Sequence, residues 1–296
     1  EDMFLKKKSF AGSWEGRFCT EEYDVVMEQR KDTALTIDFE NGQTEVLSGA
    51  EIYKLVFDSN NPWMLSANGT IFTTEFEGVI PGLLKRWYAE RKELQKKLKK
   101  AKDAGNAAEI EYWDKRQLVK KILLNSLYGA ILNPGCRFFD KRIGQSTTLT
   151  GRTIVKHMSA EANKVITGVY DHVGDAMIYG DTDSCYFSAW PTLKDDVESG
   201  KIEWNTEKAI TLYDQVADAV DSTFSVMMAK QFHCPKSRAT VIAAGREIVA
   251  QSGLFITKKR YAALVVDNEG FRTDVDGKAG KVKAMGLDLR RSDTPV

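Results

Sequence analysis

The sequence predicts an α+β protein in which an antiparallel sheet with flanking helices is joined to a long antiparallel helical hairpin. Two observations support this class. Short strand-like runs flank turn signals, notably Asn41-Gly42 and Asn68-Gly69. Residues 81–129, in contrast, repeat apolar side chains at helical spacing. With 296 residues, the chain is long enough for a large core in one or two domains.

The charge of the chain is balanced, with 42 basic and 42 acidic residues. Average charge therefore predicts no nucleic-acid partner, and any such partner has to be argued from local patches. No apolar run is long enough to span a bilayer, so no membrane partner is expected. The four cysteines are far apart and form no CxxC pair, which favours reduced thiols in a cytoplasmic protein. Because the first residue is Glu1 and not methionine, we expect a fragment or a processed piece.

Residues 1–80 contain the two Asn-Gly hairpins, and a helical hairpin follows them. Pro81-Gly82 opens its first helix, Gly105-Asn106 interrupts the pattern, and the second helix runs from about Ala107 to Tyr128. A short connection makes two such helices antiparallel neighbours. The apolar residues expected to define them are Leu84, Trp87, Leu94 and Leu98 on the first helix and Tyr112, Leu118, Ile122 and Leu123 on the second.

The helical hairpin is strongly basic. Between Lys85 and Lys121 the sequence has thirteen basic and six acidic residues, so a neutral protein carries one positively charged projection. A solvated helical face explains such a pattern by default. The excess is notable, but it is weak evidence for a partner when taken alone.

Residues 130–296 are predicted to mix helices with strands. A helix through 150–170 precedes the strand, turn and strand of AMIYG, DTD and SCYF, and another helix spans about Thr206 to Gln231. ATVIAA and KKRYAALVVD are strand-like, with a turn at Asn268-Glu269-Gly270. We expect the last stretch, KVKAMGLDLRRSDTPV, to end without a closing element.

Asp181 and Asp183 lie one residue apart on the tight turn of YGDTDS. Two carboxylates this close repel each other unless a cation lies between them. Mg²⁺ is such a cation, because it binds one or two carboxylates together with substrate phosphates. An ordinary turn is the default explanation of an isolated Asp-Thr-Asp-Ser, since Asp and Ser favour turns. A calcium loop of the EF-hand type is excluded, because its glycine and distal glutamate are absent.

A second group of polar residues occurs in KILLNSLYG. Lys121, Asn125 and Tyr128 stand at i, i+4 and i+7, which forms one polar stripe on a leucine-rich helix. Buried polar groups need partners, so the stripe meets either protein groups or a ligand. Lys121 suits a phosphate, Tyr128 suits a base pair, and Gly129 leaves room for close approach. Arg91 interrupts the apolar stripe of the opposing helix, and a second cation there suits a triphosphate. Snorkelling surface side chains are the alternative for each residue alone.

A third group of residues is the KKRY sequence. Strand alternation would send Lys258 and Arg260 to one face and Lys259 and Tyr261 to the other. Basic residues close to a carboxylate centre suit a nucleic-acid backbone. A charged edge strand that discourages aggregation is the simpler explanation of this motif alone.

The three motifs are specific when their order and spacing are considered together. KxxxNSxYG is followed about fifty residues later by YGDTDS and then by KKRY, and this series resembles the family B DNA polymerases. AERKELQ, LLNSLYGAILNPGCRFFD, GREIVAQSGLFITKKRYA and MGLDLRRSDTP also stand in the order of that family. Within it, the sequence most resembles the replicative polymerases of T-even-like tailed phages. The resemblance extends from about Asp58 onward, whereas residues 1–57 match poorly.

The resemblance implies a DNA-directed DNA polymerase that adds dNMP to a primer 3′-hydroxyl under the direction of a template. Residues 81–129 would be the fingers, 130–296 the palm, and 1–80 an N-terminal palm-associated segment. Primer–template DNA and dNTPs would be the partners, and a phage-encoded protein would act in the host cytoplasm. A sliding clamp is a further candidate partner, but no segment identifies it.

The family pattern also implies roles for individual residues. Asp183 would bridge two Mg²⁺ ions, for which Mn²⁺ is an alternative, and Asp181 would lie adjacent and be less directly involved. Arg91, Lys121 and Asn125 would bind the triphosphate, and Tyr128 and Gly129 would lie against the nascent base pair. Lys259 would approach the primer end, within a DNA-binding group that includes Lys258, Arg260 and Tyr261. Glu247 would be a further acidic residue of the palm.

One expected motif is missing. The second metal-binding aspartate of the family belongs to a stretch like DxxSLYPS upstream of the fingers, and no such stretch occurs; Asp2 is near the expected place in a different context. The exonuclease and thumb segments of the family are not recognisable either. We therefore expect an incomplete polymerase chain. The alternatives are a subunit of a split polymerase, completed by a second polypeptide with the exonuclease and the missing aspartate, and a non-catalytic DNA-binding module.

Overall fold

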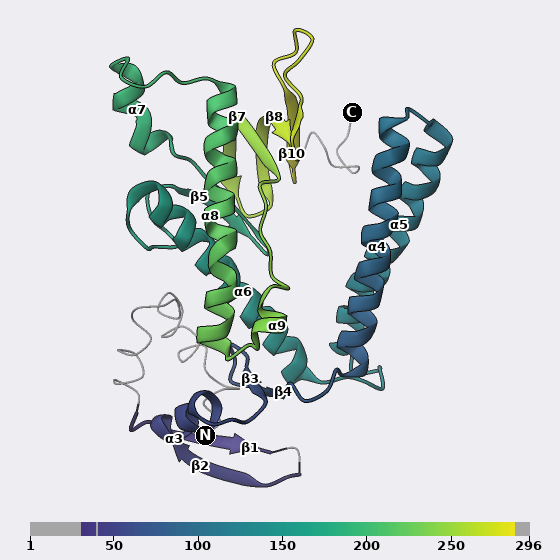
Figure 1. Ribbon diagram of the computed structural model, residues 1–296, viewed down its shortest axis with the longest axis vertical. Coiled ribbons are helices and arrows are strands. Elements are labelled where there is room, and N and C mark those ends of the chain that lie inside the picture. Colours follow the sequence, from purple (N-terminus) through teal and green to yellow (C-terminus); the bar gives the residue numbers. More distant parts are fainter. Residues whose placement is uncertain (1–30, 40, 288–296) are drawn as a thin grey trace.

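The computed structural model describes residues 31–39 and 41–287. It shows a long helical hairpin, formed by α4 (Val79–Asp103) and α5 (Ala107–Ile131), that rises beside a region of packed helices and small antiparallel sheets (Figure 1). The α+β class with a helical hairpin is thereby confirmed. The division at residues 80 and 129 stays a prediction, and Asp2 lies outside the described residues.

Two antiparallel hairpins precede the helical hairpin. β1 (Ala34–Asp38) pairs with β2 (Thr44–Ser48), and β3 (Trp63–Leu65) pairs with β4 (Ile71–Thr73), which confirms both predicted Asn-Gly turns. Between these pairs, α3 (Gly49–Tyr53) continues as the π-helix η1 (Lys54–Asp58). A capping box of Ser48 and Glu51 starts α3. This lobe is held by its own small core, which consists of Leu35, Ile52, Val56 and Leu65.

The two long helices pack along a narrow seam. The predicted stripe of α4 is confirmed, since Leu98 is buried and Leu84, Trp87 and Leu94 are half-buried. The apolar residues expected to define α5 are instead exposed: Tyr112, Leu118, Ile122 and Leu123. The reason is that the seam with α4 takes only about one residue per turn of α5. Trp113, Gln117 and Lys120 fill that role, the last in an ion pair with Glu90.

The main core lies between α6 (Lys141–Thr167) and α8 (Thr206–Phe232), whose positions largely confirm the predicted helices. Apolar side chains of α8 recur at helical spacing and are almost fully buried, namely Val216, Val220, Phe224 and Met227. α7 (Trp190–Glu198) and α9 (Lys236–Ala239) are short additions. Nowhere in residues 31–39 and 41–287 does a helix combine the length and apolarity needed to cross a bilayer.

Two sheets carry the later motifs. β5 (Met177–Asp181) and β6 (Ser184–Phe187) form the predicted strand–turn–strand, and β7 (Ile248–Thr257), β8 (Arg260–Asn268) and β10 (Lys281–Met285) form a second antiparallel sheet in the order β10-β8-β7. The short β9 (Phe271–Arg272) pairs with β8 after the predicted turn at 268–270. The last stretch begins with β10, and residues 288–296, on which the expectation of no closing element depends, lie outside the described residues.

The prediction of a strand for ATVIAA was also wrong. Its first residue ends α9, and residues 240–247 form an irregular connection. Side chains of α8 accept hydrogen bonds from this connection, which pairs with no strand in the described part of the chain. Asp221 Oδ1 accepts the Ala244 N–H at 2.6 Å, and Asp214 Oδ1 accepts a bond of 2.6 Å from Arg246 Nε. Arg246 Nη1 also pairs with the buried Asp267 of β8.

His157 of α6 is a buried polar residue inside the main core. Its Nε2 lies 2.8 Å from Thr223 Oγ1, and its Nδ1 lies 3.1 Å from Tyr170 Oη. Burial, assisted by the positive charge of Lys164, lowers the pKa of His157 from 6.5 to about 4. The folded state therefore holds this imidazole neutral, whereas the unfolded chain takes up a proton as the pH falls below 6.5.

Acidification should destabilise the fold through His157. Its contribution to the free energy of unfolding is fully present above pH 6.5 and is lost as the pH falls. The loss reaches about 3 kcal/mol near pH 4, because one pKa unit corresponds to about 1.4 kcal/mol. Urea unfolding between pH 7 and 4, compared with His157→Gln, measures it. The variant should show a smaller loss of stability over this range. An identical pH dependence in both proteins would contradict the assignment.

Candidate active site

The tip of the β5–β6 hairpin presents the two predicted carboxylates. Asp181 pairs with Ser184, so Thr182 and Asp183 form a two-residue turn, in which the Asp183 N–H donates to the Asp181 carbonyl at 2.6 Å. Thr182 has a φ of +54°, an uncommon value for a β-branched residue. Its hydroxyl donates to Asp181 Oδ1 at 3.0 Å. Asp183 is exposed and Asp181 half-buried, so the tip offers both carboxylates to a ligand.

The carboxylate pair fits part of a metal site. Carboxylate oxygens suit Mg²⁺, which is commonly held by one or two carboxylates together with substrate phosphates. Across residues 31–39 and 41–287, no three His, Cys, Asp or Glu side chains gather into a group that could hold a metal by themselves. Asp181 and Asp183 would therefore hold an ion jointly with a substrate or with a further ligand.

Four aromatic rings connect this hairpin to the larger sheet, and we refer to them as the aromatic cluster: Tyr179, Tyr186, Phe255 and Tyr261. Tyr186 lies 5.1 Å from Phe255 and 5.3 Å from Tyr261 between ring centroids, and Phe255 stacks on Tyr261 at 5.3 Å. The hydroxyls of Tyr186 and Tyr261 are 2.9 Å apart. Burial, together with this hydrogen bond, raises the pKa of the Tyr186 phenol. The cluster thus fixes the two sheets against each other.

The KKRY motif is a turn and not a continuous strand. Thr257 pairs with Arg260, so Lys258 and Lys259 are the two turn residues between β7 and β8, and the predicted alternation of these lysines between two faces was wrong. Tyr261 is buried in the aromatic cluster. The Lys259 N–H donates to the Tyr179 hydroxyl at 2.7 Å. This bond places the lysine turn beside the strand that ends in Asp181.

Glu247 takes a separate position. Its Oε1 pairs with Lys283 Nζ of β10 at 3.0 Å, and its charge helps to raise the pKa of Tyr186. Glu247 therefore lies near the aromatic cluster. It does not join Asp181 and Asp183 in a metal-binding group among the residues that the structure describes.

The polar stripe of α5 is more open than the sequence suggested. Lys121, Asn125 and Gly129 are exposed, while Tyr128 is half-buried. Arg91 Nε donates to Gln117 Oε1 at 3.3 Å. Gln117 lies one turn before Lys121, so the two predicted cations stand about one helical turn apart on facing helices.

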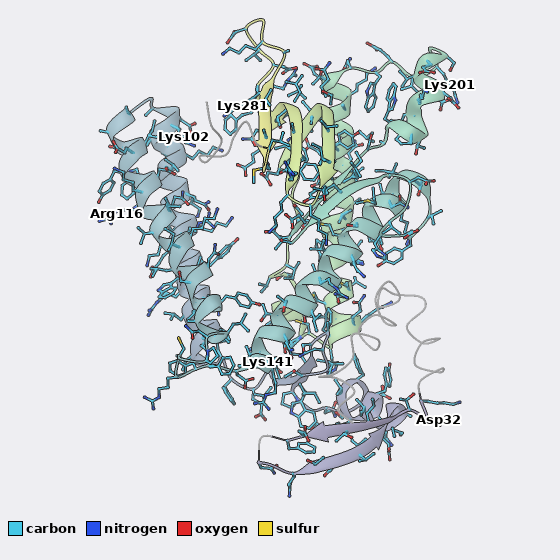
Figure 2. All side chains as sticks on the ribbon, turned by 180° about the vertical axis from the view of Figure 1, so that it is seen from behind. Asp32, Lys102, Arg116, Lys141, Lys201 and Lys281 are labelled. Carbon is cyan, nitrogen blue, oxygen red and sulfur yellow. The ribbon has the colours of Figure 1, made fainter. Side chains whose placement is uncertain are left out.

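A cleft of about 880 Å³ connects the base of α5 with the carboxylate hairpin. Tyr128, Asp181 and Thr182 line it together with side chains of α6, and the Tyr128 hydroxyl donates to the Gly144 carbonyl of α6 at 3.2 Å. Figure 2 shows Lys141, the first residue of α6, at the junction between the helical hairpin and the rest of the molecule. The other predicted site residues do not line this cleft: Asp183, Arg91, Lys121, Asn125, Gly129, Lys258, Lys259, Arg260, Tyr261 and Glu247.

The α6 wall of the cleft escaped the sequence analysis. Thr148, Arg152 and Lys156 line it at i, i+4 and i+8, a spacing that could have identified them as one polar stripe. Burial lowers the pKa of Lys156, and the charge of Arg152 lowers it further. Burial and the charge of Lys156 likewise lower the pKa of His172, which also lines the cleft. This positive wall on the cleft of Asp181 suits an anionic ligand.

The cleft thus brings one carboxylate, Asp181, together with the basic side chains of α6 and Tyr128. The family model of DNA polymerase family B matches residues 43–211, more than half of the chain. The chain belongs to DNA polymerase family B.

Several known proteins are similar to this chain. It is 32% identical over 189 residues to a DNA-directed DNA polymerase of Escherichia phage RB69, which covers 60% of this chain and 20% of that protein. It is 27% identical over 222 residues to a DNA polymerase of Pyrococcus glycovorans, which covers 75% of this chain and 22% of that protein. A solved family B DNA polymerase of Pyrobaculum calidifontis aligns over 94% of this chain and 26% of its own, at 18% identity and a TM-score of 0.46. The chain thus spans about a fifth of the length of these relatives.

The hydroxyl pair inside the aromatic cluster should be energetically coupled. Tyr186→Phe and Tyr261→Phe each leave one hydroxyl without its partner, so each should cost about 1 kcal/mol, and the double variant should cost about 1 kcal/mol less than the sum. Urea unfolding of the three variants measures this coupling. Tyr186→Phe combined with Tyr88→Phe, on an exposed ring of α4, should be additive. Additive costs for the clustered pair would contradict the coupling.

Proposed function

We propose that this chain supplies the fingers and palm surfaces of a DNA polymerase that adds dNMP to a primer 3′-hydroxyl under the direction of a template. The observation that carries the proposal is the β5–β6 tip. Asp181 at this tip lines the same cleft as Tyr128. Tyr179, on the strand that ends in Asp181, accepts a hydrogen bond from the Lys259 N–H of the β7–β8 turn. These contacts support a site at which metal, nucleotide and primer would meet.

The carboxylate pair would hold the metal. Asp183, with Asp181 beside it, would bind Mg²⁺, and Mn²⁺ is an alternative with the same preference for oxygen ligands. Two such ions, when bound, stabilise the attacking and the leaving oxygen of a phosphoryl transfer. The exposed position of Asp183 leaves room for phosphate oxygens beside its own.

The helical hairpin would bind the incoming nucleotide. Arg91, Lys121 and Asn125 would hold the triphosphate, because two cations one turn apart match its charge. Tyr128 and Gly129, at the end of the same helix, would lie against the nascent base pair. These residues would orient the substrate and neutralise its charge. Orientation and charge neutralisation supply much of the acceleration in phosphoryl transfer.

The DNA would contact two groups of basic residues. Lys258, Lys259 and Arg260 at the β7–β8 turn would face the primer end, with Tyr261 supporting them from the aromatic cluster. Arg152 and Lys156 of α6 add a second group on the cleft that Asp181 lines. Such groups bind phosphates whatever the base sequence.

A second metal-binding aspartate is still required for the two-metal reaction. The described residues gather no third metal ligand, and the sequence contains no DxxSLYPS stretch. We therefore assign this carboxylate to another region of the polymerase or to a second polypeptide. The incomplete ligand set also favours one alternative function, which is DNA binding without turnover.

Primer extension tests the proposal. The chain is assayed with Mg²⁺, four dNTPs and a primer–template, both alone and with a polypeptide that carries the DxxSLYPS aspartate. Extension is expected in the complemented reaction. Asp183→Asn should reduce its rate at least about 100-fold, because it removes a charge that stabilises the transition state. The matched control is Asp195→Asn on the exposed surface of α7, which should retain the wild-type rate.

Each other outcome has a definite meaning. Extension by the chain alone would show that it already contains every metal ligand. Retained DNA binding without extension in any mixture would replace catalysis by the binding function. Neither extension nor DNA binding would overturn both functions.

A further inference from the structure

We propose that Tyr179 and Gly286 are positioning residues that hold the Lys259 turn at a fixed place beside the carboxylate hairpin. This inference rests on the proposed function for its catalytic consequence. Its structural part stands on the contacts of the turn and can be tested without DNA.

Tyr179 reaches the turn from the carboxylate strand. It stands on β5, two residues before Asp181, and its hydroxyl accepts the Lys259 N–H at 2.7 Å. Its ring lies 5.6 Å from Phe255 and 5.7 Å from Tyr261, at the ends of the two strands that the turn connects. One side chain therefore extends from the strand of Asp181 to the backbone of Lys259.

Gly286 packs against the carbonyl of the same residue, Lys259. It follows β10, and a Cβ atom at this position would lie 2.1 Å from the Lys259 carbonyl oxygen. Its φ of +60° also favours glycine. The Gly286 carbonyl accepts a bond from Arg260 Nε at 3.2 Å. The chain after β10 thus packs directly on the turn, and any larger residue would displace it.

Together, these contacts engage both backbone groups of Lys259. The N–H is bound by Tyr179, and the carbonyl is packed against Gly286. Lys259 has a φ of +61°, which costs a residue other than glycine roughly 1–2 kcal/mol, so the turn needs support from outside. A fixed backbone limits the directions that the lysine side chain can take. Pre-organisation of this kind lowers the entropic cost of binding a phosphate.

Amide exchange tests the Tyr179 contact directly. Tyr179→Phe keeps the ring and removes the hydroxyl, and Tyr186→Phe is the matched control, because its hydroxyl bonds Tyr261 and not the turn. We expect the Lys259 amide to exchange about 10-fold faster in Tyr179→Phe, which corresponds to one lost hydrogen bond, and to be unchanged in Tyr186→Phe. Equal exchange in both variants would overturn the assignment.

A pair of glycine variants tests the Gly286 contact. Gly286→Ala and Gly277→Ala both place alanine at a positive φ, but Gly277 has no neighbouring atom within 4 Å of the added Cβ. Backbone strain is therefore common to both. NMR shifts of the amides at 258–260 should change in Gly286→Ala and stay as in the wild type in Gly277→Ala. Equal changes, or none in either variant, would remove Gly286 from the proposal.

Steady-state kinetics of the complemented polymerase test the consequence. Tyr179→Phe should raise KM for primer–template about 3- to 10-fold and change kcat less than about twofold. Lys259→Ala should raise KM by at least as much, and adding Tyr179→Phe to it should have no further effect, because the hydroxyl acts through the lysine. A further rise in the double variant would overturn this role. Failure of the wild type to extend primers would overturn the proposed function, while the amide exchange would still decide the structural part.

Discussion

The candidate site depends on the packing of the aromatic cluster between two separate sheets. The β5–β6 pair has two strands, and a hairpin of that size is marginally stable on its own. Tyr179 and Tyr186 bury its face against Phe255 and Tyr261, so the larger sheet supplies the missing support. The same contact sets the distance between the carboxylates and the lysine turn. A change that loosens these rings therefore affects the geometry of the site before it affects the overall fold.

The other end of the carboxylate hairpin is held by α6. The buried Asn163 bonds the loop that leads into β5: its Nδ2 donates to the Val169 carbonyl at 2.8 Å, and its Oδ1 accepts the Ala176 N–H at 3.0 Å. α6 also carries the positive wall of the cleft and contacts Tyr128 through Gly144. One helix thus positions the hairpin, the cleft and the base of α5. The upper part of the helical hairpin stands apart from this framework (Figure 1).

Local signals in the sequence explain which predictions were confirmed. The Asn-Gly hairpins, the long helices and the turn of Asp181 follow from residues that favour one backbone conformation by themselves. The β7–β8 turn was misassigned because Lys258 and Lys259 carry no turn signal, and its support comes from Tyr179 and Gly286, which are distant in sequence. β10 was missed for a similar reason, since it is defined by its pairing with β8. The family resemblance supplied candidate site residues but not Arg152, which the cleft lining shows and which the i, i+4 spacing of Thr148, Arg152 and Lys156 could have indicated.

Under the proposed function, one metal–nucleotide complex contacts both the carboxylate hairpin and the helical hairpin. Paramagnetic NMR with Mn²⁺ and a dNTP tests it directly, because Mn²⁺ broadens the amides that lie near it. We expect broadening at residues 181–184 and, when dNTP is present, at Asn125 and Tyr128 of α5, with both effects lost in Asp183→Asn. Broadening confined to acidic surfaces elsewhere, or unchanged in that variant, would contradict a shared nucleotide site.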